Sequence, residues 1–261
     1  MKILDLIKHP NSVKIGDVCP NIEPNVTEDT VFLLDGEAVG FYIADIGKHS
    51  EKAIQLATLA NAELRSDRVP KTKMDRKKFL GNGQYRVITQ YSTILGFVPP
   101  KPHMRRNYPT MSSVHNVESA RMFIKAMLML CHEGEEIIRK LTPSIFERQE
   151  RIISENVPTK YRFGRLFTSS ISNYNISAPY HQDNANLRGS VNIIIAKKAG
   201  ATGGHTTVPD YGLTVNSCDN SMLVYPAWAN IHAVTPIEPH EDGGYRNSLV
   251  FYPLKYTGVQ K

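Results

Sequence analysis

The chain has 261 residues and carries 31 Lys plus Arg against 25 Asp plus Glu, for a formal charge of +6. With 41% hydrophobic and 21% charged residues, it is neither disordered nor fibrous, and it is long enough to bury one sizeable core or two small ones. No apolar run approaches the roughly 18 residues of a membrane span, so the sequence predicts no integral membrane protein and no membrane partner.

Cysteine usage and the first residues indicate the compartment. Cys19, Cys131 and Cys218 are widely spaced and form no CxxC pair. This argues against a disulfide scaffold or a thiolate zinc site, and for a reducing environment. The start, MKILDL, has an early acid and no small-residue cleavage site, so no signal peptide is expected. We therefore predict a cytoplasmic or nuclear protein that is not secreted, with no obligate protein partner evident.

The N-terminal half reads as a mixture of a hairpin and helices. Residues 31–46 predict a β-hairpin, and Ser50 precedes an amphipathic helix that reaches Leu64. After an irregular, proline-rich loop over 98–112, the longest helical pattern runs over 117–141. A shorter helix is expected over 145–154.

Positive charge is concentrated between the first predicted helix and that loop. Residues 65–106 hold 11 basic and 2 acidic side chains, a net charge of +9. Such a block fits either a polyanionic partner or a plain solvated face. Aromatic residues within or beside it, such as Phe79 and Tyr85, favour phosphate contact combined with base stacking, although several of them are expected to be strand core.

After Pro158 the pattern changes to short β-rich runs separated by turn residues. These runs are residues 162–170, 190–196, 221–225 and 247–252. The sequence thus predicts an α+β fold, with helices packed on one outer face of an antiparallel β-sandwich or barrel. We predict a single catalytic domain over 1–261, with N-terminal α/β elements over 1–157 and a β-rich core over 158–261.

One ordered set of polar residues lies within the β-rich half. His181 and Asp183 are two residues apart and point to the same side if the chain is extended; His232 follows 49 residues after Asp183. Two imidazoles and one carboxylate form the facial triad that holds non-haem Fe(II) and leaves positions open for a co-substrate and O2. Arg246, with Ser248 two residues on, could then bind a carboxylate in a fork geometry.

These motifs resemble the catalytic core of Fe(II)/2-oxoglutarate dioxygenases, and more narrowly the TET/JBP group, which oxidises the 5-methyl group of pyrimidines in nucleic acid. The resemblance covers about residues 165–256. It includes HxD followed by an Asn, the Gly203-Gly204 turn leading to Pro209, the distal His in an H-x-V-T-P context, and RxS on the last strand. The resemblance implies a double-stranded β-helix core of the jelly-roll or cupin type, with the N-terminal helices and hairpin packed on its sheet.

The resemblance also implies roles for individual residues. It makes His181, Asp183 and His232 the iron ligands, and Arg246 and Ser248 the partners of the distal carboxylate of 2-oxoglutarate. The Arg that some members place five residues before HxD is replaced by Ile176. Loose candidates for the other carboxylate are therefore the following residues: Asn173, Tyr174, Asn175 and Asn192. The expected substrate contacts are three further residues: Asn184, Asn186 and His205.

Three functions are consistent with this pattern. The first is an enzyme that uses Fe(II), 2-oxoglutarate and O2 to hydroxylate the 5-methyl group of thymine or 5-methylcytosine in DNA, which would lie across residues 65–106. The second is a hydroxylase of a protein side chain or small molecule, for which the basic stretch is incidental. The third is a nucleic-acid-binding module with a degenerate site, which the complete triad disfavours.

Overall fold

The computed structural model describes residues 1–81, 83–100, 108–240 and 243–255. Residues 101–106, the end of the predicted basic stretch, lie outside this part. The main helices are α1 (Glu51–Arg65), α2 (Arg121–Leu141) and α3 (Pro143–Asn156). Every described helix is too short or too polar to span a lipid bilayer.

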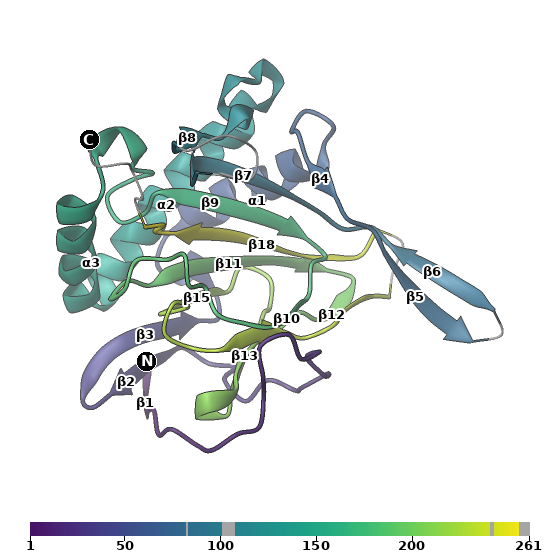
Figure 1. Ribbon diagram of the computed structural model, residues 1–261, viewed down its shortest axis with the longest axis horizontal. Helices are drawn as coiled ribbons and strands as arrows, with labels where there is room; N and C mark the ends of the chain where they lie inside the picture. Colours follow the sequence, from purple (N-terminus) through teal and green to yellow (C-terminus); the bar gives the residue numbers. More distant parts are fainter. Residues whose placement is uncertain (82, 101–107, 241–242, 256–261) are drawn as a thin grey trace.

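Two stacked sheets form the body (Figure 1). The major sheet has the order β1-β2-β3-β15-β11-β18-β9-β7-β4, with β8 paired to β7. Its strands are β1 (Lys2–Asp5), β2 (Thr30–Leu34), β3 (Glu37–Ile43), β4 (Thr72–Lys73), β7 (Tyr91–Val98), β8 (Thr110–Met111), β9 (Ser169–Tyr174), β11 (Asn192–Ala199), β15 (Met222–Tyr225) and β18 (Tyr245–Tyr252).

The minor sheet has the order β10-β16-β13-β14 and lies across one face of the major sheet. Its strands are β10 (Ala178–His181), β13 (Thr206–Val208), β14 (Leu213–Val215) and β16 (His232–Val234). Two separate ribbons complete the fold, β12 (Ala201–Gly203) with β17 (Ile237–Pro239), and β5 (Arg76–Gly81) with β6 (Gln84–Ile88). The α+β class and the double-stranded β-helix architecture are confirmed.

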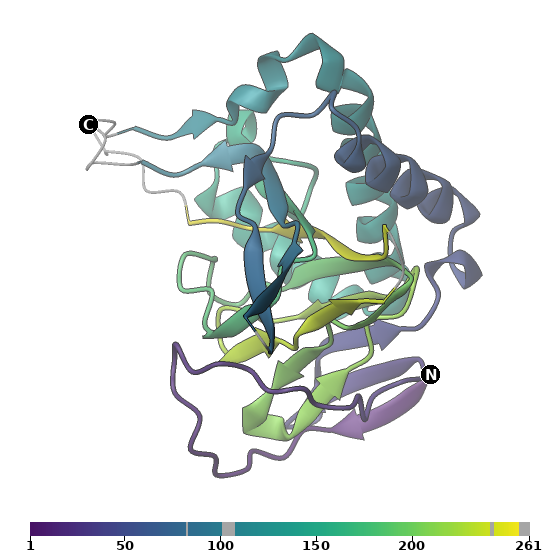
Figure 2. The same ribbon diagram turned by 90° about the vertical axis from the view of Figure 1, so that its right-hand side faces the viewer.

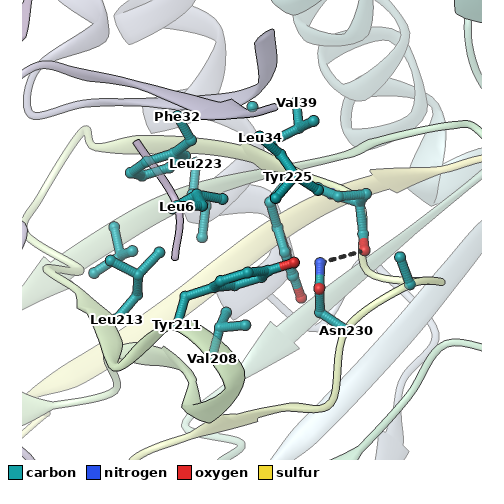
Figure 3. Close-up of a pocket in the computed structure, with 14 residues that line it drawn as sticks. Leu6, Phe32, Leu34, Val39, Val208, Tyr211, Leu213, Leu223, Tyr225 and Asn230 are labelled. Atoms are coloured by element: carbon teal, nitrogen blue, oxygen red, sulfur yellow. Dashed lines mark hydrogen bonds between the residues drawn. The ribbon is translucent and has the colours of Figure 1, made fainter. Parts of the chain in front are cut away.

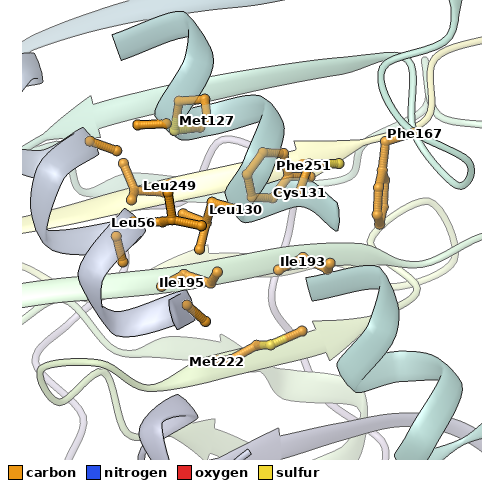
Figure 4. Packing of buried hydrophobic residues seen from close by; sticks show 14 of the residues in the cluster. Leu56, Met127, Leu130, Cys131, Phe167, Ile193, Ile195, Met222, Leu249 and Phe251 are labelled. Atoms are coloured by element: carbon orange, nitrogen blue, oxygen red, sulfur yellow. The ribbon is translucent and has the colours of Figure 1, made fainter. Parts of the chain in front are cut away.

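The helices cover the other face of the major sheet, as predicted (Figure 4). Ile193 and Ile195 of β11 and Leu249 and Phe251 of β18 are fully buried against them. Because side chains alternate along a strand, Ile194 of β11 points between the two sheets. The same strands therefore build the helix-side core and the wall of an inter-sheet cavity.

The N-terminal segment runs alongside the minor sheet in extended form (Figure 2). It is tied there by backbone hydrogen bonds: the His9 amide donates to Asp210, the Gly16 amide to Tyr180 and the Asn25 amide to Thr214. The predicted hairpin, β2–β3, joins the major sheet edge to edge through β15.

The helix boundaries follow the predicted capping signals. The Ser50 hydroxyl accepts from the Ala53 amide and begins α1. Pro143, expected to close the long helix, occupies the first turn of α3 directly after α2 ends at Leu141. The long helix begins at Arg121, later than predicted, because residues 113–120 form two short 3-10 turns.

One strand prediction was wrong in part. Residues 162–168 are not part of a strand; β9 begins at Ser169. Gly164 adopts φ +80°, and the amides of Arg165 and Leu166 donate to the buried Glu135 carboxylate, so this segment turns against α2 instead of pairing in the sheet. The basic stretch holds β4 to β7, and the buried Tyr91 and Phe97 of β7 agree with the expectation that several of its aromatic residues are strand core.

Candidate metal centre and active site

A cavity of about 240 Å³ lies between the two sheets and contains the predicted triad. His181 ends β10 and His232 begins β16, and the two residues are direct partners in the antiparallel register. Their ring centroids are 4.2 Å apart. Asp183 lies just past β10, where its amide donates to the Ala227 carbonyl. The potential ligand atoms of these three residues all lie within 4.8 Å of one another.

The two imidazoles are oriented for metal binding. Nδ1 of His181 lies 2.8 Å from the Pro179 carbonyl oxygen, and Nδ1 of His232 lies 3.0 Å from that of Asn230. A carbonyl only accepts, so Nδ1 carries the proton in both rings and Nε2 offers a lone pair. Nε2 of His181 is 3.7 Å from Oδ1 of Asp183. Burial, and then the neighbouring His181, lower the pKa of His232, which favours the neutral form that a ligand needs.

Two buried amides orient the Asp183 carboxylate. Asn192 Nδ2 donates to Asp183 Oδ2 at 3.1 Å, and Asn186 Nδ2 donates to Asn192 Oδ1 at 2.8 Å. Asn186 also reaches Asp183 Oδ2 at 3.4 Å. These bonds engage one carboxylate oxygen and leave Oδ1 facing His181. Sequence reasoning assigned Asn192 to the co-substrate and Asn186 to the substrate; the structure adds this orienting contact for both.

Arg246 places a positive charge at the same cavity. It is 2% exposed, and in the described residues no carboxylate forms an ion pair with it. Its Nε donates to Ser217 Oγ at 3.0 Å. Burial lowers the pKa of its guanidinium to about 10. A buried cation without an acid is costly unless an anion binds beside it. The cavity thus fits a carboxylate ligand, with the Ser248 hydroxyl lining the same wall.

The Gly203-Gly204 turn makes room for this arginine. Gly204 has φ +75°, and a Cβ there would lie 2.9 Å from both Cγ and Cδ of Arg246. At Gly203, a Cβ would lie 1.8 Å from the Pro236 carbonyl oxygen. Only glycine permits both the backbone conformation and the close approach. The turn motif is therefore explained by the packing around the guanidinium.

The remaining predicted residues are divided between the cavity and its surroundings. Asn173 lines the cavity, and so does Ile176, in the place of the missing arginine. Tyr174 instead stacks on Tyr91 at 4.4 Å, and Asn175 Oδ1 accepts from the Arg246 amide. Of the loose candidates for the second carboxylate, only Asn173 and Asn192 face the cavity.

An adjoining open cavity of about 440 Å³ shares Asp183 and Asn192 with the first. Two of the three predicted substrate contacts, Asn184 and Asn186, line it. The third, His205, is buried behind the guanidinium, where its Nδ1 accepts from the Ser217 amide. Burial, then Lys198 and Arg246, lower its pKa to about 4.

Sequence reasoning missed two residues of the site. Ser217 contacts both His205 and Arg246 but lies in a loop without any motif. Tyr225 lines the cavity, and its ring centroid lies 5.3 Å from that of His232. The alternation of its strand could have indicated that it faces inward. The Trp228 indole N–H donates to the Ser190 carbonyl.

The fold and this constellation define a class: a double-stranded β-helix with a two-His, one-carboxylate metal site and a buried cation for an acidic co-substrate. The family model described as the oxygenase domain of the 2OGFeDO superfamily, Tet_JBP, matches residues 100–255. The chain belongs to this family and is an oxidoreductase of the Fe(II)/2-oxoglutarate dioxygenase superfamily, whose members use Fe(II), 2-oxoglutarate and O2.

Among the solved structures that match this chain, NgTET1 supports the fold. NgTET1 in complex with 5mC DNA matches with a TM-score of 0.58 at 12% identity, covering 93% of this chain and 84% of that one. OsALKBH1 matches at 0.40 and 11% identity, covering 82% and 97%; a collagen prolyl hydroxylase of Paramecium Bursaria Chlorella virus-1 matches at 0.36 and 12%, covering 77% and 91%. No curated protein matches the sequence significantly.

Proposed function

We propose that this oxygenase hydroxylates the 5-methyl group of a pyrimidine, thymine or 5-methylcytosine, in DNA. His181, Asp183 and His232 would hold the iron, and Arg246 and Ser248 the distal carboxylate of 2-oxoglutarate. Bound iron supplies O2 activation, with 2-oxoglutarate as the electron donor. The chain itself binds the co-substrate and positions the substrate. NgTET1, which has a similar fold, was determined with 5mC DNA.

The observation that carries the DNA assignment is the hairpin β5–β6, which projects from the body (Figure 1). The base of this hairpin, where it joins the body, lies at the rim of the cavity that contains the metal site. Arg76 Nη1 donates to Ser177 Oγ at 3.4 Å, next to Ala178 in the cavity wall, and Lys78 pairs with Glu238 at 2.7 Å. A substrate lying along this arm would therefore pass the entrance to the metal site.

The two faces of the hairpin carry different chemistry. Directly opposed residues share a face, so the register places Phe79 with Tyr85 and Lys78 with Arg86. Phe79 and Tyr85 are 59% and 61% exposed, with ring centroids 5.1 Å apart. Exposed aromatic rings on a basic arm suit base stacking together with phosphate contact.

The geometry sets a requirement on the DNA. Asp183 and His232 lie between the two sheets, so a methyl group within a stacked duplex cannot reach them. The target nucleotide must be flipped out or lie in a single strand. The open cavity lined by Asn184 and Asn186 offers polar groups to the edge of such a base.

Nucleoside mass analysis tests the assignment. Protein, Fe(II), ascorbate and 2-oxoglutarate are incubated with methylated and unmethylated DNA, which is then digested and its nucleosides weighed. We expect a 5-hydroxymethylpyrimidine in the wild type and none in His181→Ala. Uncoupled turnover of 2-oxoglutarate without any oxidised nucleoside on DNA would contradict the substrate assignment and favour a protein or small-molecule substrate.

A salt titration tests whether the hairpin β5–β6 contacts DNA phosphates. Lys77 and Arg86 are exposed and do not tie the hairpin root, so replacing both with Ala removes charge only. If each contacts a phosphate, the slope of log K against log salt falls by about 2 on duplex DNA. The matched control replaces Lys125 and Lys140, exposed on α2, and should leave the slope unchanged. Equal effects of the two double variants would rule out the hairpin as the contact.

A further inference from the structure

A second cavity, whose lining residues are shown in Figure 3, adjoins the cavity of the metal site at Tyr225. It has a volume of about 70 Å³ and is formed by the hairpin β2–β3 and strands β13 to β15. Its walls are mostly hydrocarbon, with Phe32, Val208, Leu213 and Leu223 among the buried side chains. The amide of Asn230, one of its few polar groups, is engaged by the Pro226 carbonyl at 3.1 Å.

One residue lines both this cavity and the cavity of the metal site. Tyr225 lines both cavities and is 6% exposed. Its ring meets the His232 ring edge to face, at an interplanar angle of 84°. A small molecule in the apolar cavity is therefore one ring away from a proposed iron ligand, without passing through the polar cavity that Arg246 serves.

The chemistry of the walls restricts what can occupy the space. A cavity of 10–15 Å³ already admits a water molecule, but water needs about two to four polar partners, and apolar cavities stay dry and take up xenon. The occupant must therefore be small, apolar and uncharged. 2-Oxoglutarate and a nucleotide are both excluded, because each carries charge that these walls cannot compensate.

We infer that this cavity binds dioxygen and supplies it to the metal site past Tyr225. The inference rests on the proposed iron site, because only a reaction that consumes O2 gives such a store a use. Dioxygen is the one reactant of the superfamily that is small and apolar. Separate entry would let it reach the metal while the charged co-substrate and the DNA fill the polar side.

Xenon, as an inert probe of the same size class and polarity, tests occupancy without any turnover. The metal-free wild-type protein is placed under xenon pressure and examined by crystallography or ¹²⁹Xe NMR. We expect xenon between Leu213, Leu223 and Tyr225. Xenon uptake elsewhere only, or none, overturns the inference and leaves the proposed function untouched.

A variant that fills the apolar cavity tests whether the cavity supplies O2 to the metal site. Val208→Phe places a ring in the cavity, and Val208→Leu is the milder version if the larger change prevents folding. We expect the KM for O2 to rise about fivefold or more in uncoupled turnover without DNA, with the KM for 2-oxoglutarate unchanged. The matched control is Val18→Phe, at a position 85% exposed and outside both cavities.

Different results would contradict the O2-supply role of the cavity and the proposed function of the protein. An unchanged KM for O2 in a folded Val208 variant that no longer takes up xenon refutes the supply role alone. Absence of O2 consumption in the wild type with Fe(II) and 2-oxoglutarate contradicts the iron site, and the supply role with it. Oxidation of a substrate other than DNA would contradict the proposed substrate but not the cavity.

Discussion

Arg246→Met should make the metal-free protein more stable while weakening its hold on 2-oxoglutarate. Burial lowers the pKa of Arg246 to about 10. A lowering of this size corresponds to a cost of about 3 kcal/mol for keeping the guanidinium charged in the folded state. The variant also loses the hydrogen bond to Ser217, which contributes about 1 kcal/mol. The net gain is therefore about 2 kcal/mol, or a rise in Tm of roughly 4–8 °C.

The binding measurement should move in the opposite direction. Hydrogen bonds to a charged group are worth about 1.5–3 kcal/mol, so the affinity for 2-oxoglutarate should fall roughly 10- to 150-fold. Thermal melts of Mn(II)-loaded protein with increasing 2-oxoglutarate measure both effects, because a ligand stabilises the fold in proportion to RT ln(1 + [L]/Kd). The melting curves of wild type and variant should cross as the co-substrate concentration rises.

The sign of the pH dependence provides a check. A cation with a lowered folded-state pKa destabilises the fold at every pH below about 10 and stops doing so only above it. The advantage of Arg246→Met should therefore be constant between about pH 6 and 9. Arg246→Lys keeps the charge but not the fork, so it should lose affinity without gaining stability. A metal-free Met variant that melts below the wild type would refute the reasoning.

Three further outcomes are expected. Asn192→Ala removes a hydrogen-bond donor from the Asp183 carboxylate. It should weaken the binding of Co(II) or Fe(II) roughly 10- to 100-fold in a titration followed by absorbance. Unchanged affinity would show that the amide does not orient the carboxylate. Gly204→Ala should push the Arg246 guanidinium aside and lower kcat/KM for 2-oxoglutarate roughly 10- to 100-fold. The control is Gly212→Ala, which is also at positive φ but has open space around its Cβ and should leave kcat/KM unchanged. His205 has its pKa lowered to about 4, so the unfolded chain binds the extra proton. Stability should therefore fall as pH drops from about 6.5 to 4, by about 3 kcal/mol. His205→Gln should reduce that loss in urea titrations, and an identical acid profile would contradict it.

Periodicity and spacing predicted the parts of the molecule that local rules determine. Ser50 caps its helix, and alternating residues place Ile193 and Ile194 on opposite faces, as a period of two requires. The triad was predictable because its residue types and order are unusual. Its geometry was not, because the pairing of His181 with His232 joins residues 51 positions apart.

Contacts without a motif remained outside the reach of sequence reasoning. Ser217 holds Arg246 from a loop, and nothing in its neighbours distinguishes it from a surface serine. The segment at 162–168 has strand composition, yet its amides bind Glu135, a long-range contact that composition does not encode. The basic stretch was predicted as charge interleaved with aromatic residues, and only the register of β5 with β6 revealed which of them share a face.

The irregular pairing of β10 with β16 has a consequence for how this chain can change. The register shifts between Ala178 and His181, and this shift brings His181 opposite His232. Three residues of β10 therefore span the interval that two residues of β16 span, and this extra residue lets both Ala178 and His181 line the cavity although they are three positions apart. An insertion between Ala178 and His181 would shift the pairing by one residue and change which side chains face His232, whereas the hairpin β5–β6 contributes no residue to the metal triad. Catalytic chemistry and substrate choice can therefore diverge independently in this chain.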